Sequence, residues 1–426
     1  MKNRSLWLGV LIFFSTPVCL LASAKWTVMV YMAGDNNLFP YALQDINEMK
    51  LVGSNNNLSI VVQLDGYGSE EKTERLLIQK DQAVNVDNSL AGKKLDSGNP
   101  QTLIDFCTWA TDKYPADHYM LVLWNHGSGI LDPLQGRSWK ASDFFIENNL
   151  TGKLEIDRSL SFIQWIAQRG VCFSDTNNSY INDQGLSRAL YSITKHLGKK
   201  IDIIAFDACM MAMAEVINTT RFYADYLIGS EEVEPGDGWH YSEALLPLTQ
   251  GTMNPSEFAI HAVEAYRSIY TGHVSDFTQS AIDLNKSYSV LNTIDRLSQL
   301  LLKGLAVQID RSLELAILAS RDGKHCLNFA EPAYIDLLNF YRNLMLLMPF
   351  VKLEVGNQLL IDQISKTLES GIKSINQIVI ASAAGTNLTR SGGISIYFPT
   401  KSVDQSYEKT SFARENSWIK LLHYFS

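Results

Sequence analysis

The sequence predicts an α/β protein: a mostly parallel sheet with helices on both faces, followed by a helical C-terminal region with a small β element. Short, continuously apolar runs recur between residues 25 and 282, and stretches with helical spacing separate them. Continuously apolar strands are typical of parallel sheets, because both faces of such a sheet are buried. Beyond residue 283 the sequence changes to long, leucine-rich helical stretches.

The expected buried strands lie at 26–32, 58–64, 119–124, 201–206 and 226–229, and residues 73–79 are expected to form a hairpin arm. The expected helices lie at 38–52, 100–114, 183–197 and 210–219. The first strand ends in a turn cluster at 33–37, which is rich in Gly, Asp and Asn. Together these elements predict one core at 25–282, in which 128–182 is too long for a routine connection and is expected to be a loop or processing linker.

The region 283–426 is predicted to be mainly helical with late strands. Its helical stretches lie at 288–320, 334–347 and 359–372, and its strand-like stretches at 375–382 and 394–398. We interpret the leucine-rich pattern as plain helical packing rather than as a coiled coil or a docking helix.

Composition excludes several classes of protein. The chain has 426 residues, of which 46% are hydrophobic, 10% aromatic and 19% charged, and these values exclude disordered and collagen-like chains. The formal net charge is −9, which is not the balance of a nucleic-acid-binding surface, so we expect no nucleic acid partner. The length allows two or three domains, or one large domain with an appendage.

Residues 1–24 differ from the rest of the chain. Lys2 and Arg4 form a positive start, residues 6–14 are apolar, and small residues lead up to Ala24. This pattern predicts a secretory signal peptide that is cleaved after Ala24. We therefore expect a secreted or periplasmic protein that does not contact the membrane after signal removal. Separately, we expect a monomer.

Two alternatives for this leader fit less well. An uncleaved membrane anchor would have to use residues 6–21, which are short for a span and include Pro17. A lipoprotein signal would need a small residue just before Cys19, where Val18 stands.

The five cysteines are too sparse for a disulfide scaffold. Cys19 lies in the leader, and the others are Cys107, Cys172, Cys209 and Cys326. One or two disulfides stay open, and the sequence does not pair them. Cys107 lies in an expected helix and is interpreted as a buried, inert thiol.

Polar residues follow several of the predicted strands. Ligands of open α/β sheets bind beyond the carboxyl ends of the strands, which places Asp35, Asp65, His126 and residues 207–209 along one edge. The sequence has no nucleotide-binding P-loop, no zinc-peptidase HExxH and no serine-nucleophile elbow. After these exclusions, the remaining candidate catalytic residues are a histidine and a cysteine, each of which follows a buried strand.

A thiolate is a strong nucleophile, and a neighbouring imidazole or helix N-terminus favours its formation. Cys209 fits this placement if the helix at 210–219 begins beside it. The backbone N–H groups of Gly127 and Cys209 could then hold an oxyanion. The plainer alternative is that His126 is a structural residue and Cys209 a core residue.

Several motifs resemble the clostripain family of C11 cysteine peptidases. The residues Asn-His-Gly-Ser-Gly at 125–129 and Asp-Ala-Cys-Met at 207–210 are similar to the two active-site motifs of that family. Further similar segments lie at 26–37, 230–239 and 393–399, so the resemblance runs from about residue 25 to residue 399 in family order. The resemblance implies a caspase-like α/β fold and a catalytic dyad, with His126 as general base and acid and Cys209 as nucleophile.

The resemblance also implies cleavage of proteins or peptides after Arg or Lys. Asp207 occupies the position implicated in recognising the basic side chain, and Asp237 is the second candidate. A carboxylate in a partly desolvated pocket can bind a guanidinium with two hydrogen bonds. The alternative for Asp237 is a simple turn residue.

Family members are often zymogens that are processed between the two motifs, so we expect self-processing after Lys140. We expect no required cofactor and no catalytic metal. The resemblance leaves calcium open, although no EF-hand-type loop stands out. Two rival functions are a catalytically silent binding protein and a metal hydrolase that uses Asp35, Asp65 and Asp207.

Overall fold

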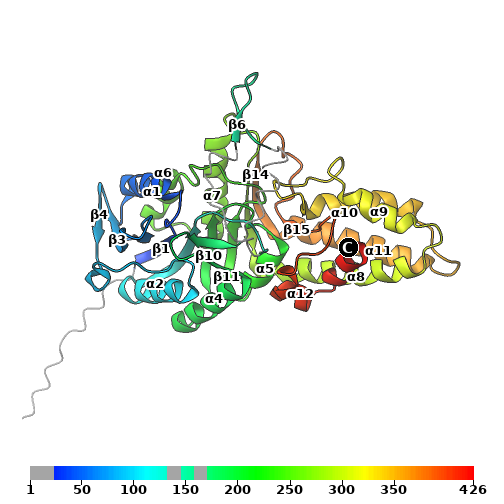
Figure 1. Ribbon diagram of the computed structural model, residues 1–426, viewed down its shortest axis with the longest axis horizontal. Coiled ribbons are helices and arrows are strands. Elements are labelled where there is room, and N and C mark those ends of the chain that lie inside the picture. The colour runs from blue at the N-terminus through cyan, green and yellow to red at the C-terminus, as the bar shows by residue number, and fades with distance from the viewer. Residues whose placement is uncertain (1–23, 132–144, 158–169) are drawn as a thin grey trace, which may run out of the picture.

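The computed structural model describes residues 24–131, 145–157 and 170–426. Within them, nine strands form one sheet in the order β14-β12-β11-β10-β5-β1-β2-β3-β4 (Figure 1). The central strands of this sheet run parallel; they are β11 (Ala224–Gly229), β10 (Ile201–Asp207), β5 (Ala116–Trp124), β1 (Ala24–Met32) and β2 (Leu58–Asp65). The predicted mostly parallel sheet is confirmed.

Antiparallel strands lie at both edges of this sheet. On one side β3 (Thr73–Gln79) pairs with β2 and continues into β4 (Gln82–Asn85). On the other side β12 (Thr278–Asp283) pairs with β11 and with β14 (Val379–Ala384), which comes from the C-terminal part of the chain. The sequence did not predict β12, because Thr278, Gln279 and Ser280 are polar although they are fully buried.

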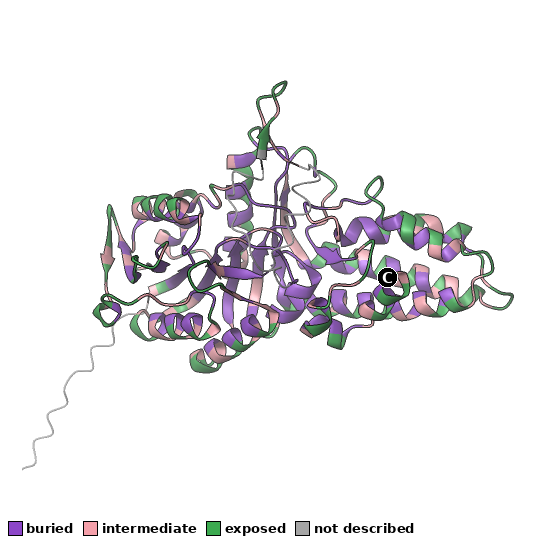
Figure 2. Ribbon diagram, viewed as in Figure 1, coloured by how far each residue is buried: buried purple, intermediate pink, exposed green. Residues whose placement is uncertain are grey.

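The sheet divides two hydrophobic cores. In β1, Met29 and Tyr31 belong to one core and Val28 and Val30 to the other, because successive side chains of a strand point to opposite faces. The first face is covered by α2 (Pro100–Lys113), α4 (Asp183–Leu197) and α5 (Ala214–Thr220). The second face is covered by α1 (Phe39–Val52), α6 (Tyr241–Leu245) and α7 (Pro255–Tyr270). Figure 2 shows the strands between these helices as buried almost throughout, so the expected cover on both faces is confirmed.

The C-terminal helices extend the first core beyond the edge of the sheet (Figure 1). They are α8 (Ser287–Ala306), α9 (Ser312–Arg321), α10 (Leu337–Leu347), α11 (Gln358–Ile378), α12 (Ser411–Glu415) and α13 (Trp418–Phe425). A small sheet joins β13 (Tyr334–Asp336) to β15 (Ser395–Tyr397).

The expected single helix at 288–320 is two helices, and Arg311 between them has a left-handed backbone (φ 57°). The strand expected from 375 begins only at 379, because α11 continues to Ile378.

The long connection after β5 contains two short hairpins where it is described. One joins β6 (Phe145–Glu147) to β7 (Leu154–Ile156), and the other joins β8 (Val171–Ser174) to β9 (Ser179–Ile181). The expected leader up to residue 23 and the expected processing site Lys140 lie outside the described residues.

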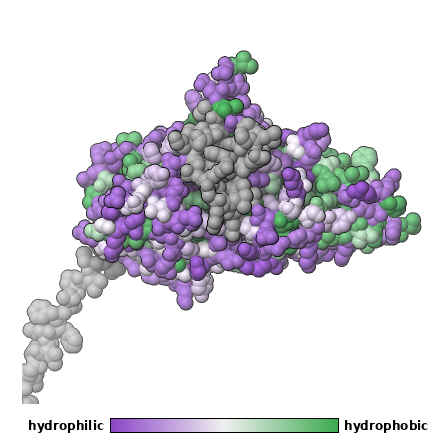
Figure 3. Space-filling view, in the orientation of Figure 1, coloured by the Kyte–Doolittle hydropathy of each residue, from purple (hydrophilic) through white to green (hydrophobic). Residues whose placement is uncertain are grey.

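Large exposed apolar side chains gather at the far end of the C-terminal helices; they include Ile309, Leu315, Leu346, Phe350, Val355 and Leu359. Figure 3 shows this end of the molecule as more hydrophobic than the rest of the visible face. No helix in the described part of the chain has both the length and the apolar character needed to span a bilayer.

The packing of α11 against α10 gives a stability prediction. A Cβ atom at Gly371 would lie 2.0 Å from the ring of the buried Tyr341. Overpacking costs about 1–3 kcal/mol, and the helix propensity of alanine, about 1 kcal/mol, offsets only part of it. We therefore expect Gly371→Ala to lower the melting temperature measured by circular dichroism. The control is Gly323→Ala, whose added Cβ would lie 3.5 Å from its nearest neighbour. Equal melting temperatures for the two variants would contradict this packing.

Candidate active site

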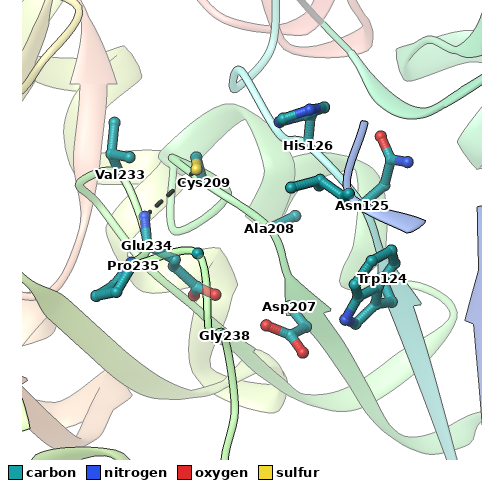
Figure 4. A pocket seen from close by; sticks show the side chains of 12 residues that line it. Trp124, Asn125, His126, Asp207, Ala208, Cys209, Val233, Glu234, Pro235 and Gly238 are labelled. Atoms are coloured by element: carbon teal, nitrogen blue, oxygen red, sulfur yellow. Dashed lines mark hydrogen bonds between the residues drawn. The ribbon is translucent and has the colours of Figure 1, made fainter. Parts of the chain in front are cut away.

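The site lies where two neighbouring parallel strands end. Asp207, the last residue of β10, pairs with Trp124, the last residue of β5, and the Asn125 N–H donates to the Asp207 carbonyl oxygen at 3.2 Å. His126 and Cys209 each follow two residues after their strand, and both line the same pocket. Figure 4 shows the imidazole and the thiol on one side of that pocket. The structure thus brings together the two residues that the sequence singled out.

A glycine makes this meeting of the two loops feasible. A Cβ atom at Gly127 would lie 2.3 Å from the carbonyl oxygen of Cys209 and 2.9 Å from its nitrogen. Any other residue would push the two loops apart, because real Cβ atoms do not approach backbone atoms this closely. The backbone N–H of Gly127 donates to the Cys209 sulfur, and the N–H of Glu234 donates to it at 3.3 Å.

The imidazole of His126 is held by a residue from a third strand end. Its Nε2 lies 2.8 Å from Oδ1 of Asn37, in the turn that follows β1. An amide oxygen only accepts hydrogen bonds, so Nε2 carries the hydrogen of this contact and, when the ring is neutral, Nδ1 is the acceptor nitrogen. Asn37 therefore selects the tautomer of His126, a role that the sequence analysis did not assign.

The expected helix beside Cys209 is wrong. α5 begins at Ala214, and Met210 has a left-handed backbone (φ 59°). The backbone of residues 210–213 hydrogen-bonds to a segment that is distant in the sequence, instead of forming a helical turn. The Met210 N–H donates to the carbonyl of Glu232 at 3.1 Å, and the Ala212 N–H donates to the carbonyl of Ser230 at 2.8 Å. The Cys209 thiol is therefore not at a helix N-terminus and lacks the stabilisation that such a position gives to a thiolate.

The environment of Cys209 favours the neutral thiol over the thiolate. Burial, together with the negative charge of Glu234, raises the pKa of Cys209 to about 12. All four described cysteines are free, so neither of the disulfides left open by the sequence is present among them. Cys107, Cys172 and Cys326 are buried, whereas Cys209 is only half-buried. Among these four residues, Cys209 is the least buried.

The pocket also carries buried carboxyl groups on the side away from the thiol (Figure 4). Asp207 is 5% exposed and accepts hydrogen bonds from the Tyr241 hydroxyl at 2.8 Å and from the Trp239 N–H at 3.3 Å. Burial raises the pKa of Asp207 to about 6, against the opposing effect of hydrogen bonds from Tyr241 and Glu234. The charge of the neighbouring Asp207 also raises the pKa of Glu234 well above its usual range, because two like charges this close disfavour each other.

Glu234 and Asp45 complete an acidic cluster with Asp207. Their side chains are 4% and 1% exposed. Burial raises the pKa of both groups well above the usual range, and the charge of Asp207 raises each further. Gln279 donates to Glu234 at 3.1 Å and Trp124 donates to Asp45 at 2.6 Å. Within the described residues, no Lys or Arg forms an ion pair with any of the three carboxyl groups.

Asp237 is placed differently from Asp207. Its side chain is exposed, and its neighbours Gly236 and Gly238 line the pocket whereas Asp237 does not. Gly238 has a positive φ of 54°, and a Cβ there would lie 2.7 Å from Oδ1 of Asp207. The loop thus packs its backbone against the Asp207 carboxylate and leaves Asp237 at the rim.

Asp35 and Asp65 do not join the site. Both accept from Lys94 Nζ, at 3.2 Å and 2.8 Å, and Asp35 also accepts from Ser174 and Thr176. The rival metal site of Asp35, Asp65 and Asp207 is therefore not assembled. No group of three or more His, Cys, Asp or Glu in the described ranges is arranged to hold a metal ion.

The residues that the sequence analysis missed left weak signals. Asp45 lies on the otherwise apolar face of its helix, which is unusual for an unpaired acid. Glu234 lies in the acidic run Ser-Glu-Glu-Val-Glu at 230–234, which looks like a solvated loop in the sequence but is buried. Neither signal indicates which residues Asp45 and Glu234 contact, because those residues lie far away in the sequence.

Comparison with known proteins agrees with this geometry. The model of the clostripain family matches residues 30–161 and 157–425. Clostripain from Hathewaya histolytica is 26% identical over 325 residues, which are 64% of this chain and 56% of clostripain. The chain thus spans little more than half the length of that curated relative.

Solved structures of similar fold agree as well. A secreted C11 cysteine protease from Bacteroides thetaiotaomicron, in complex with an irreversible peptide inhibitor, has a TM-score of 0.59 at 19% identity and covers 94% of this chain and 99% of its own. An inactive zymogen C11 protease from Parabacteroides distasonis has a TM-score of 0.56 at 19% identity. The match covers 92% of this chain and 98% of the zymogen chain. At these identities the likeness shows the fold. Because the family model matches nearly the whole of the chain beyond residue 30, the chain belongs to the clostripain family.

Proposed function

We propose that the chain is a cysteine endopeptidase in which Cys209 is the nucleophile and His126 the general base and acid. The observation that carries this proposal is the pocket shared by a half-buried thiol and an imidazole of fixed tautomer. A nucleophilic thiol and a neighbouring imidazole base are sufficient for acyl transfer through a thioester. Membership of the clostripain family supports the same reaction.

In the proposed reaction, Cys209 begins as a neutral thiol and His126 as a neutral imidazole. As the Cys209 sulfur attacks the scissile carbonyl carbon, its proton passes to His126 and the C–N bond of the substrate then breaks. His126 gives that proton to the leaving amine, which leaves an acyl group on the sulfur. A water molecule, deprotonated by His126, hydrolyses the thioester and restores the thiol. The N–H groups of Gly127 and Cys209 lie beside the sulfur and are the candidate donors to the oxyanion.

The acidic cluster supports cleavage after Arg or Lys. Asp207 and Glu234 line the pocket, Asp45 lies behind them, and the exposed Asp237 lies at the rim. Buried carboxyl groups without a cation are costly, and a bound guanidinium or ammonium would compensate their charge. The substrates we propose are therefore proteins and peptides with a basic residue before the cleaved bond.

Export and activation complete the proposal. The leader up to Ala24 supports secretion, and a C11 relative of similar fold is described as secreted. The position of Lys140 between the two motifs supports self-processing, and another relative of similar fold is described as an inactive zymogen. We propose no cofactor for the chemical step.

A panel of fluorogenic peptides ending in Arg, Lys, Leu or Asp tests the reaction and the pocket together. We expect cleavage after Arg and Lys alone, and its loss in Cys209→Ala. Asp207→Asn should lower kcat/KM for the basic peptides by roughly 30-fold or more, since a desolvated charge pair is worth about 2–5 kcal/mol. The control Asp237→Asn should lose less, because Asp237 is exposed. Cleavage after Leu, or full activity without Cys209, would contradict the proposal.

The raised thiol pKa predicts how Cys209 reacts with iodoacetamide. With a pKa of about 12, the thiolate fraction grows about tenfold per pH unit below that value, so the labelling rate should rise tenfold per unit from pH 7 to 9. Peptide mapping should find the label on Cys209 and not on the buried Cys107, Cys172 or Cys326. A rate that is constant across this range would mean that the thiolate already exists, and would overturn the neutral-pair mechanism.

Lys140→Ala tests self-processing. We expect the variant to remain as a single chain on denaturing gels and to show lower peptidase activity, because the basic residue before the cleaved bond is gone. Lys153→Ala, in the same connection, is the matched control and should mature normally. Unchanged maturation of Lys140→Ala would rule out processing at this position.

A further inference from the structure

The C-terminal helices contribute to a second cleft, which shares no lining residue with the pocket of Cys209. Its walls are α10, the junction of α11 with β14, and the loop that leads from β14 to β15. The cleft encloses about 550 Å³, whereas a single water needs only about 10–15 Å³. A ligand of many atoms therefore fits in it.

The charge of this cleft is opposite to that of the whole chain. Its lining includes Arg342, Arg390 and His325 but no Asp or Glu, although the chain carries a formal net charge of −9. Neither guanidinium forms an ion pair with an acid in the described ranges. The carboxyl group of Asp336 lies buried behind the lining and interacts electrostatically with Arg342. No acid lines the cleft itself, so two exposed arginines there are a site for carboxylates or other anions.

Neutral polar side chains surround these cations. The lining contains amides and hydroxyls from Asn339, Asn343, Asn376, Ser382 and Thr389. The amide nitrogens of Asn339 and Asn343 already donate to backbone carbonyls of the protein, so Asn376, Ser382 and Thr389 are the polar groups offered to a ligand. An amide offers both donors and an acceptor, as does the backbone of an extended peptide. The cleft thus matches a polypeptide that carries negative side chains better than it matches an apolar ligand.

The walls of the cleft are held in place by hydrogen bonds. Arg390 Nη1 donates to the carbonyl of His325 at 3.0 Å, and Asn339 Nδ2 donates to the carbonyl of Arg390 at 2.8 Å. The N–H groups of Asn339 and Gly392 both donate to the buried carboxylate of Asp336, the first at 2.6 Å. The loop is thereby fixed to the start of α10, and the cleft exists without a ligand. Such preorganisation lowers the entropic cost of binding.

We propose that this cleft binds an acidic peptide segment, with Arg342 and Arg390 paired to its carboxylates. A member of a peptidase family meets polypeptides, and the acidic segment would lie outside the residues that fill the pocket of Cys209. The inference goes beyond the proposed function and does not depend on the role of Cys209. It can therefore be tested on a chain that lacks the thiol.

The test measures fluorescence anisotropy of a labelled peptide of alternating Asp and Ser, added to the Cys209→Ala chain. We expect saturable binding whose affinity falls as the salt concentration rises. Combining Arg342→Gln with Arg390→Gln should lower the affinity at least tenfold. The control is Arg188→Gln, at an arginine of α4 that is also exposed but lies outside the cleft, and this variant should bind as the parent does. Arg342 lies on the exposed face of a helix. The single variant Arg342→Gln should therefore lose part of the binding affinity without unfolding.

A charge reversal sharpens this test. Arg342→Glu combined with Arg390→Glu should lose the Asp–Ser peptide and gain affinity for a Lys–Ser peptide. Absence of binding, or equal binding by the cleft variants and Arg188→Gln, would overturn the proposal. Displacement of the peptide by inorganic phosphate at the same concentration would overturn it too, because the cleft would then be a small-anion site.

Discussion

The backbone contact between Gly127 and Cys209 is the constraint on which the site depends. Parallel pairing of β5 with β10 brings the two strand ends together, but it does not bring the loops beyond them into contact. That contact needs a residue without a Cβ, since an added Cβ would lie 2.3 Å from the Cys209 carbonyl. With the loops touching, the imidazole, the thiol and the backbone N–H groups share one pocket. The turn after β1 then fixes the imidazole through Asn37.

Glu234 connects the thiol of Cys209 to the acidic cluster. Its backbone N–H donates to the Cys209 sulfur, while its side chain lies beside Asp207 in the acidic cluster. The same segment accepts the Met210 N–H through Glu232 and thereby prevents a helix from starting beside the thiol. Burial raises the pKa of the thiol and of the Asp207 carboxyl group above their usual values. In this account a basic side chain completes the charge balance of the pocket, and proton transfer to His126 occurs during attack.

The sequence predicted those features that depend on local pattern. The apolar runs located the strands that end at Trp124 and Asp207, and strand ends in a parallel sheet predicted that His126 and Cys209 face one edge. Features that depend on distant partners were not predictable in this way. Met210 has an ordinary helical sequence around it, yet its N–H bonds to Glu232, so the predicted helix starts late. The turn at 33–37 was recognised from its residue types, but nothing in the sequence links Asn37 to His126. β12 is buried although polar, and hydropathy does not detect it.

The most direct test of the central claim is a crystal structure of the chain inactivated by a peptidyl acyloxymethyl ketone with arginine next to the reactive group. The account predicts a thioether bond to the Cys209 sulfur, His126 beside that bond, and the guanidinium within hydrogen-bonding distance of the Asp207 carboxylate. An adduct on another residue would contradict it. So would a guanidinium that points to solvent, away from the buried acids.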